Sequence, residues 1–393
     1  MSPQRATAYV HVDAIARNCA RLRSELSASG ELCAVVKANG YGHGAVASGR
    51  AALAGGATWL AVASADEAAE LRSAGLREGP ILVMGALTEE ELELALAVNA
   101  DVVVWREHDV ERVAAAGGGR VHVKLDTGMG RLGTREGAQA GAVADLAART
   151  DAVHLVGLMT HFATADELDD DGFFDAQLRA FEGFVDAIRA SHPEVLVHAA
   201  NTAATLREPR AHFDMVRCGI AIYGMDPFGL DPLERRLEPA LELRSYVADV
   251  KLCRAGESVG YGRRFIAARD TWIGVLPLGY GDGFRRAFTN NCDVLIAGAR
   301  RPVVGTVSMD NVTVELGEED ASRSLLGAEA TLIGEQAGVR ITAEELARRI
   351  HTINYEITCG ITARVPRVDD TVSASAGAGG LAPARERDEA GRA

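Results

Sequence analysis

Short apolar runs alternate with helix-like stretches through the first half of the chain. Eight runs rich in Val, Ile or Leu are each followed by Gly or polar residues and then, in most cases, by an Ala-rich stretch. Strands that alternate with helices pair in parallel and are buried on both faces. Eight such units close into a (β/α)8 barrel. The expected strands are 33–37, 58–63, 80–84, 101–105, 120–125, 154–160, 195–199 and 213–217.

Helical spacing predicts the elements that connect these strands. The expected helices are 44–56, 65–75, 88–97, 108–116, 136–149 and 173–191, with a short one after Thr202. A further helix precedes the first barrel strand, since Ile15, Cys19, Leu22 and Leu26 form one apolar stripe. A doubly wound open sheet is the alternative, but no Gly-x-Gly-x-x-Gly turn follows the first strand.

The pattern changes after about residue 235 to short alternating strands separated by turn signals, which predicts a mostly antiparallel β domain. A helix is expected at 342–350, with Thr342 and Glu345 forming a capping box. The expected strands are 241–254, 258–261, 271–278, 293–297, 302–307, 311–315, 329–333 and 361–368.

The chain is therefore predicted to be an α/β protein with two domains. Residues 7–235 form a TIM barrel, although 7–12 are a strand expected to join the second domain. Residues 236–372 form the mostly antiparallel β domain. The tail, 373–393, has almost no bulky apolar residues and is expected to be disordered.

Charge and composition exclude some classes of protein. The formal net charge is −14 at pH 7, which argues against a nucleic-acid binder, because such proteins neutralise phosphates with basic patches. No apolar run reaches ~18 residues, so no membrane span is expected. The six cysteines form no Cys-x-x-Cys pair, so no metal site is expected. We expect a cytoplasmic location, because the N-terminus does not resemble a signal peptide.

Lysine is rare in this chain, which has three lysines among 41 basic residues. Only an amine can lose its proton and attack a carbonyl, whereas a guanidinium cannot. Lys37 ends the first expected strand and Lys124 the fifth, while Lys251 lies in an alternating stretch and is expected to be solvated. Burial at a strand end lowers the pKa of a lysine, so Lys37 is expected to act as a nucleophile or base.

Polar side chains at the carboxyl ends of the barrel strands are expected to converge on one mouth, where the active sites of such barrels lie. Loops after the seventh and eighth strands often bind phosphate, through backbone N–H groups or hydroxyls. A lysine beside a phosphate site on a barrel points to pyridoxal 5'-phosphate (PLP). The converging residues are Lys37, Lys124, Asp126, Arg131, His161, 198–202, Arg217 and Gly219.

The segment around Lys37 resembles a motif of a known family. Ala34-Val35-Val36-Lys37-Ala38-Asn39-Gly40-Tyr41-Gly42-His43-Gly44 is similar to the PLP-lysine motif of the bacterial alanine racemases. The similarity extends over essentially the whole chain except the tail. It continues through 124–133, 160–162, 198–202, 214–224, 259–262, 279–283, 305–310, 352–356 and 364–367.

The resemblance implies a PLP-dependent interconversion of L-alanine and D-alanine that supplies D-alanine for peptidoglycan. It also implies a head-to-tail homodimer with two shared active sites. Lys37 would bind PLP covalently, His161 would pack against its ring, and Arg217, supported by His198, would hydrogen-bond the pyridine nitrogen. The phosphate would be held by Tyr41, Thr202, Tyr355 and the backbone of Gly219 and Ile220, and Asn201 would also contact the cofactor.

The resemblance further implies two bases on opposite faces of the substrate. Lys37 would act on the D-isomer and Tyr261 of the second subunit on the L-isomer. Arg131 and the backbone of Met309 would hold the substrate carboxylate. Lys124 would carry a carbamate that orients Arg131. Tyr280 and Asp310 would support the site, and no metal is implied.

Two alternatives stay open. Ser308 stands where many members of the family carry cysteine, which leaves room for a racemase of serine or of broader range. A non-enzymatic PLP-binding protein would need only the barrel, and the second domain with Tyr261 and Met309 argues against it. A PLP-dependent decarboxylase of the same fold is disfavoured, because it would be expected to show a different phosphate loop and a catalytic cysteine motif, and this sequence shows neither.

Overall fold

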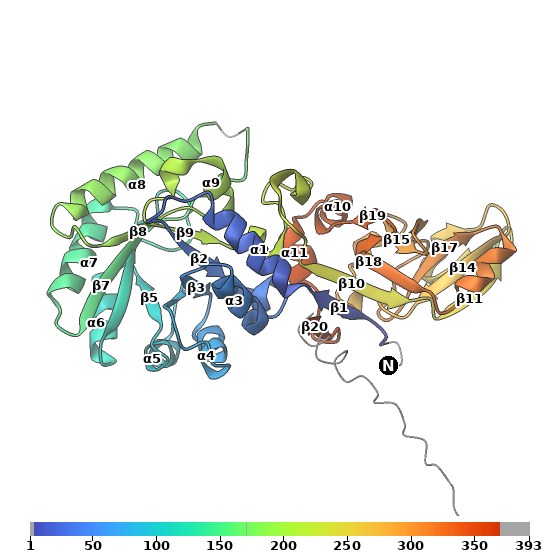
Figure 1. Ribbon diagram of the computed structural model, residues 1–393, viewed down its shortest axis with the longest axis horizontal. Helices are drawn as coiled ribbons and strands as arrows, with labels where there is room; N and C mark the ends of the chain where they lie inside the picture. Colours follow the sequence, from blue (N-terminus) through green and yellow to red (C-terminus); the bar gives the residue numbers. More distant parts are fainter. Residues whose placement is uncertain (1–3, 170, 370–393) are drawn as a thin grey trace, which may run out of the picture.

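The computed structural model describes residues 4–169 and 171–369, and its first half is a closed barrel of eight parallel strands (Figure 1). The last barrel strand pairs with the first, which closes the barrel and confirms the predicted (β/α)8 architecture. The strands are β2 (Glu31–Val35), β3 (Trp59–Val62), β4 (Ile81–Val83), β5 (Asp101–Val104), β6 (Gly119–Lys124), β7 (Val153–Met159), β8 (Leu196–His198) and β9 (Met215–Cys218).

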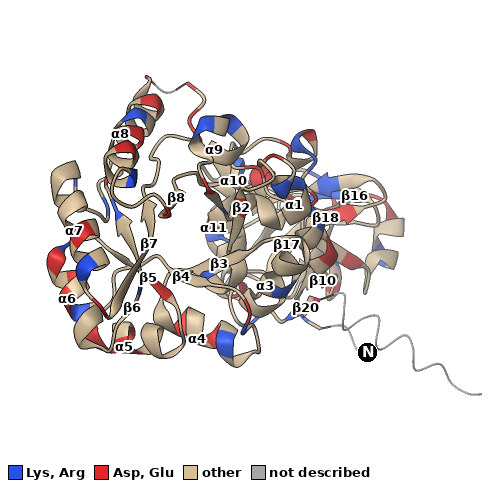
Figure 2. Cartoon of the chain, turned by 60° about the vertical axis from the view of Figure 1, so that its left-hand side comes forward, with Lys and Arg blue, Asp and Glu red and all other residues tan. Residues whose placement is uncertain are grey.

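Helices cover the outside of this barrel, and their charged residues face away from it (Figure 2). The α4 and α5 helices begin with reciprocal capping boxes, at Ser64 with Glu67 and at Thr88 with Glu91, which satisfy their first N–H groups. The helices are α3 (Ala45–Ala54), α4 (Ala65–Ser73), α5 (Glu89–Ala97), α6 (Glu107–Ala115), α7 (Gly137–Arg149), α8 (Phe173–Arg189) and α9 (Thr202–Arg207).

The second half of the described chain forms three sheets at the other end of the elongated molecule (Figure 1). The largest contains β1 (Thr7–Val10), β10 (Leu241–Tyr246), β15 (Asp293–Ile296), β16 (Ala299–Pro302), β18 (Glu329–Gln336), β19 (Val339–Ile341) and β20 (Arg367–Asp369). A three-stranded sheet contains β11 (Asp249–Cys253), β14 (Thr271–Leu276) and β17 (Val312–Gly317), and a ribbon pairs β12 (Ser258–Val259) with β13 (Phe265–Ile266).

The first and the last strands of the described chain, β1 and β20, both belong to the largest sheet. The strand β1 pairs antiparallel with β10 and parallel with β20, so the first strand belongs to the second half of the fold. The barrel strands end at Cys218 and β10 begins at Leu241, while the expected boundary at 235/236 stays a prediction. Residues 370–372 and the tail predicted at 373–393 lie outside the described residues.

Several local predictions for the second half were wrong. The expected strand 241–254 is two strands, β10 and β11, which belong to different sheets. The expected strand 302–307 is displaced to β16. The expected strand 361–368 overlaps β20 only at residues 367 and 368. Residues 354–359 form an unpredicted helix, α11 (Asn354–Cys359).

The expected capping box is only half present at the start of α10 (Ala343–Arg349). The Thr342 hydroxyl accepts from the Glu345 N–H at 3.1 Å, as a cap does. The Glu345 carboxylate binds Arg300 at 2.7 Å instead of turning back to the cap. An ion pair that is distant in sequence has therefore replaced the local contact.

Short 3-10 segments complete the described elements. They are η1 (Pro209–Ala211), η2 (Ile220–Tyr223), η3 (Pro232–Arg235), η4 (Tyr261–Arg263), η5 (Tyr280–Asp282), η6 (Arg286–Phe288) and η7 (Asp320–Leu325).

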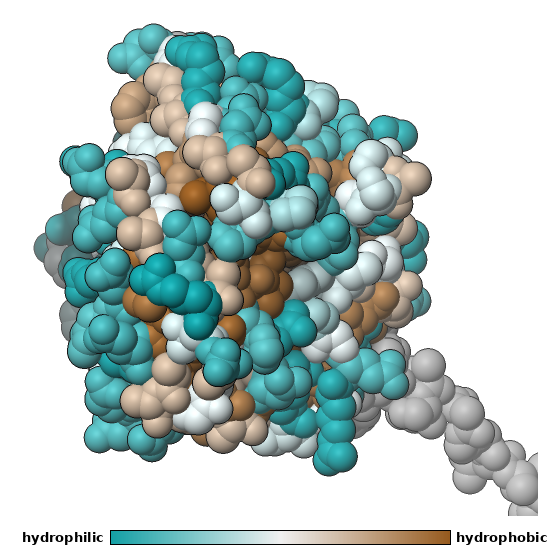
Figure 3. All heavy atoms as spheres, turned by 90° about the vertical axis from the view of Figure 1, so that its left-hand side faces the viewer, coloured by the Kyte–Doolittle hydropathy of each residue, from teal (hydrophilic) through white to brown (hydrophobic). Residues whose placement is uncertain are grey.

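The barrel side of the molecule presents a mostly hydrophilic surface with hydrophobic atoms near its centre (Figure 3). Within 4–169 and 171–369, no helix has the length and apolar character that a membrane span requires.

The α1 helix (Val12–Arg23) connects β1 to the barrel, and one buried amide fixes it there. The Asn18 side chain donates to the carbonyls of Ile222 at 3.2 Å and Glu238 at 2.9 Å, and it accepts from the Glu238 N–H at 2.9 Å. Asn18 is 1% exposed, so water cannot replace these bonds. This amide therefore joins α1 to both η2 and the segment that leads into β10.

The Asn18→Ala substitution tests this junction. It leaves buried backbone groups without partners, so we expect the free energy of unfolding to fall by about 2–4 kcal/mol. The matched control is Arg17→Ala, which removes an exposed ion pair with the same Glu238 and should cost less than about 1 kcal/mol. Urea unfolding measures both, and equal losses would contradict the assignment.

Candidate active site

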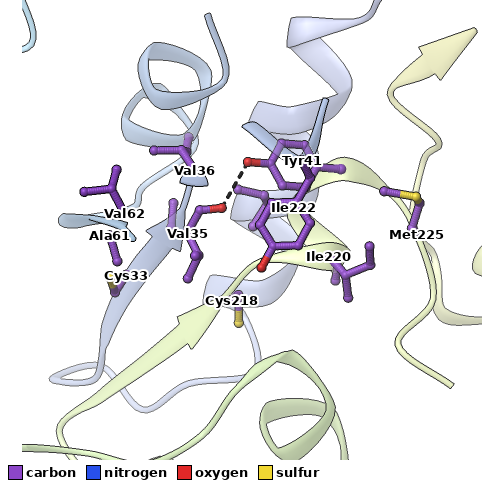
Figure 4. Packing of buried hydrophobic residues seen from close by; sticks show 14 of the residues in the cluster. Cys33, Val35, Val36, Tyr41, Ala61, Val62, Cys218, Ile220, Ile222 and Met225 are labelled. Carbon is purple, nitrogen blue, oxygen red and sulfur yellow. Dashed lines mark hydrogen bonds between the residues drawn. The ribbon is translucent and has the colours of Figure 1, made fainter. Parts of the chain in front are cut away.

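A cavity of about 270 Å³ opens at the carboxyl ends of the barrel strands. It gathers ten of the residues predicted from the sequence, which come from the segment after β2 (Lys37–Tyr41), from β9 and η2, from α9 and α11, and from the loops after β6, β7 and β8. Figure 4 shows Val35, Tyr41 and Ile220 together at this rim, beside Cys218. The lining residues are Val35, Lys37, Ala38, Tyr41, Met84, Arg131, His161, Asn201, Thr202, Arg217, Gly219, Ile220, Tyr355 and Cys359.

Lys37 begins a left-handed turn, α2 (Lys37–Tyr41), directly after the first barrel strand. Ala38 and Asn39 have φ values of 53° and 52°, a conformation that residues with a Cβ rarely adopt. Long-range contacts hold the turn, since the Ala38 N–H donates to Glu67 at 2.6 Å and Asn39 accepts from the Ala45 N–H at 3.1 Å. Strain of this kind is typical of functional sites.

The environment of Lys37 favours an uncharged amine. Burial lowers the pKa of Lys37 below its usual range, and the positive charge of Arg131 lowers it further. Arg131 is exposed on the rim and forms no ion pair with the acidic residues that the structure describes. Its guanidinium is therefore free to bind an anionic ligand at the mouth of the cavity.

Lys124 lies behind this rim at the end of β6 and is 4% exposed. Burial lowers its pKa to about 8, and the charges of Arg217 and Arg131 act in the same direction. No acidic side chain in the described part of the chain pairs with its amine. The nearby Asp126 is held instead by the N–H groups of Gly128 and Gly130, both at 3.0 Å.

Arg217, at the end of β9, is 2% exposed and uses both terminal nitrogens inside the protein. Its Nη1 donates to His198 Nδ1 at 2.8 Å and to the His198 carbonyl at 2.9 Å. Its Nη2 donates to the carbonyls of Thr160 and Ala199 at 2.8 and 3.0 Å, with His161 Nδ1 at 3.2 Å. The Nε–H is buried and has no partner within the described residues.

The charge of Arg217 is surrounded by neutral imidazoles. Burial and then the Arg217 charge hold the pKa values of His161 and His198 well below the usual histidine value. Burial lowers the pKa of Arg217 itself to about 10, so the guanidinium stays protonated at neutral pH. Arg217 is therefore a fixed donor.

Hydroxyl and backbone groups also line the cavity. The Gly219 N–H donates to the Thr202 hydroxyl at 3.0 Å, and a Cβ at Gly219 would lie 2.3 Å from the Tyr41 hydroxyl oxygen. The rings of Tyr41 and Tyr355 lie 5.9 Å apart. Burial raises the pKa of both phenols, so they stay neutral donors. Asn201 caps α9 by accepting from the Ala204 N–H at 2.9 Å.

The remaining predicted site residues form a second cluster, in the other half of the fold. Tyr261, Tyr280 and Met309 are 74%, 41% and 52% exposed, and none of them lines the cavity. Backbone contacts hold the Tyr280 and Met309 segments together, because Tyr280 N–H donates to the Ser308 carbonyl at 3.0 Å and Gly281 N–H to the Met309 carbonyl at 2.9 Å. The Thr306 hydroxyl donates to the Tyr261 carbonyl at 2.6 Å. Asp310 binds Arg364 at 2.7 Å.

The sequence interpretation missed three residues of this region. Cys359 is exposed at the cavity, whereas the other five cysteines are buried, and all six are free thiols. His122 and Asp101 are buried behind His198 and are hydrogen-bonded to each other at 3.0 Å. The period-2 spacing of His122 and Lys124 in β6 was the available signal for His122, because it places both on one face of the strand.

Comparisons with known proteins agree on one family. Models described as the N-terminal and C-terminal domains of alanine racemase match residues 10–227 and 240–369. Alanine racemases of Halalkalibacterium halodurans and Geobacillus stearothermophilus are 42% and 41% identical, and the matches cover 91% and 92% of this chain and 93% and 92% of theirs. The solved alanine racemase from Streptomyces lavendulae has a TM-score of 0.86 at 36% identity, with 94% of this chain and 98% of that one covered.

Proposed function

The chain belongs to the alanine racemase family, and we propose that it interconverts L-alanine and D-alanine with PLP as its cofactor. One observation carries most of this proposal. A single cavity contains Lys37, whose pKa is lowered, and Arg217, whose Nε–H is buried and unpartnered. The product D-alanine would supply peptidoglycan synthesis.

The residues present fit PLP at two points. The unpartnered Nε–H of Arg217 is a donor that a pyridine nitrogen would satisfy. The hydroxyls of Tyr41, Thr202 and Tyr355, with the backbone of Gly219 and Ile220 and the adjacent Asn201, offer the donors that a phosphate needs. Lys37 would bind the cofactor covalently and His161 would pack against its ring.

Bound PLP would supply an electron sink that acidifies the α-proton of the amino acid. Lys37 Nζ would then remove or return this proton on one face, because its lowered pKa leaves more of the amine uncharged at neutral pH. Arg217 would hold its own proton throughout, since its pKa of about 10 lies well above neutrality. The Arg131 guanidinium and the Met309 backbone would hold the substrate carboxylate, with Tyr280 and Asp310 in support.

The second base of this proposal is the Tyr261 hydroxyl of another copy of the chain. Tyr261 is 74% exposed and lies outside the cavity of its own chain. A head-to-tail homodimer would bring the cluster of Tyr261, Tyr280 and Met309 over the mouth of the other barrel. Both this assembly and the expected cytoplasmic location stay predictions.

Exchange at the substrate α-carbon tests the function. The protein with PLP should convert L-alanine in D2O to a mixture of equal L and D isomers, both deuterated at Cα. The Lys37→Ala variant should lose at least about a thousandfold in rate, because it removes both the covalent anchor and a base. NMR and chiral chromatography provide the readout.

L-Serine should be run beside L-alanine, because Ser308 borders the residue proposed to hold the carboxylate. Comparable rates on both would change the proposal to a racemase of broader range. PLP binding without any exchange would instead favour a non-enzymatic carrier. Exchange without inversion would remove Tyr261 from its proposed role.

Mixing two inactive variants tests the shared sites. Lys37→Ala and Tyr261→Phe each damage one half of every composite site, so both should be nearly inactive alone. Random reassociation of equal amounts should restore about a quarter of the composite sites, because one site in each heterodimer keeps both intact residues. Racemisation that stays absent after confirmed subunit exchange would contradict a site built from two chains.

We propose further that Lys124 reacts with carbon dioxide to form a carbamate, whose negative charge would orient Arg131. The pKa of about 8 supports this, because only the uncharged amine reacts. Protein equilibrated with 13C-bicarbonate should show a carbamate carbon signal by NMR that is missing in Lys124→Ala. Crystal density for a bare amine at Lys124 would refute the modification.

A further inference from the structure

A line of buried polar side chains leads from Arg217 away from the cavity through the barrel. After Arg217 Nη1 and His198 Nδ1, His198 Nε2 lies 2.9 Å from His122 Nδ1. His122 Nε2 then lies 3.0 Å from Asp101 Oδ2. Both histidines are fully buried and Asp101 is 1% exposed. Asp101 begins β5, so the line runs from the carboxyl ends of the strands toward their amino ends.

The chemistry of the two ends gives this line a direction. A guanidinium only donates hydrogen bonds and a carboxylate only accepts them. Arg217 therefore requires an acceptor at His198 Nδ1, which places the His198 proton on Nε2. His122 must then accept at Nδ1 and donate from Nε2 to Asp101. One arrangement of protons satisfies every contact, and it keeps both rings neutral.

The neighbouring strands leave space for the His122 ring inside the barrel. A Cβ at Gly157 in β7 would lie 2.2 Å from His122 Nδ1, so only glycine leaves room for the ring. The pairing of β6 with β7 shifts register between Val121 and His122. The Trp59 ring packs edge-on against His122 at 5.6 Å. An apolar core would avoid the cost of burying these polar side chains, which the chain can tolerate only because every one of them is hydrogen-bonded. A role of these residues in the site would explain why the barrel keeps them.

We propose that His122 and Asp101 are positioning residues that hold His198 as an acceptor and thereby fix Arg217, so that its Nε–H remains available to the cofactor. This rests on the proposed role of Arg217 in binding PLP. If the His198 proton moved to Nδ1, an N–H group would face Arg217 Nη1, and the guanidinium would have to turn. The orientation of a cavity residue would thus be set from the other end of the barrel.

Asp101 has a second neighbour that makes a sharp test possible. Arg120 Nε lies 2.9 Å from Asp101 Oδ1, as an ion pair without good hydrogen-bond alignment. In Asp101→Asn the amide oxygen should face this guanidinium, because the two groups attract. The amide NH2 would then face His122 Nε2, which would reverse both histidines and direct an N–H toward Arg217.

The test measures PLP dissociation from the holoenzyme of three variants by absorbance. Asp101→Asn should weaken PLP binding roughly tenfold, the loss typical when a partner behind a binding residue is removed. Arg120→Ala alone should bind PLP like the wild type. The double variant should recover, because its amide is free to turn its oxygen toward His122. Unchanged binding in Asp101→Asn, or no recovery in the double variant, would overturn the proposal.

Neutron diffraction of the wild-type holoenzyme gives an answer that does not depend on whether the variants fold. We expect a hydrogen on Nε2 and none on Nδ1 in both His198 and His122. A hydrogen on His198 Nδ1 would overturn the inference. Both readouts are independent of turnover, so the line of hydrogen bonds and the proposed racemase activity can fail separately.

Discussion

Arg217 carries a positive charge into the barrel, where only 2% of its surface is exposed, and much of the site follows from keeping that charge in place. The carbonyls of Thr160, His198 and Ala199, at the ends of β7 and β8, accept from its terminal nitrogens. The same charge helps to keep His161 and His198 neutral and contributes to the lowered pKa values of Lys37 and Lys124. A guanidinium suits this position, because an ammonium could be neutralised by the same burial.

The fold divides the proposed chemistry between two surfaces. The barrel collects the lysine, the arginines and the phosphate donors in a cavity, while the β sheets carry a tyrosine and a methionine that stand exposed. Within one chain these groups do not meet. The two-base proposal depends on a second molecule that covers the exposed side chains of Tyr261, Tyr280 and Met309.

Much of the barrel could be predicted because its signals are local. Each strand is a short apolar run that ends in glycine or a polar residue, and capping boxes such as Ser64 with Glu67 mark helix starts. The second half depended on contacts distant in sequence. The expected strand 241–254 divides because β10 pairs with β1 and β18 whereas β11 pairs with β14. Ten of the predicted residues line one cavity. The contact between Asp101 and His122 could not be predicted, because 21 positions separate the two residues and no local spacing relates them.

The pairing of β1 with β20 has a consequence for how the protein is made. Thr7–Val10 is synthesised before every barrel strand, yet one of its two partner strands is Arg367–Asp369, near the end of the described chain. The barrel lies wholly between these segments and can close while synthesis continues. The edge of β1 that faces β20 must then stay unpaired until Arg367–Asp369 has been synthesised, so the order of synthesis and the order of folding differ in this protein.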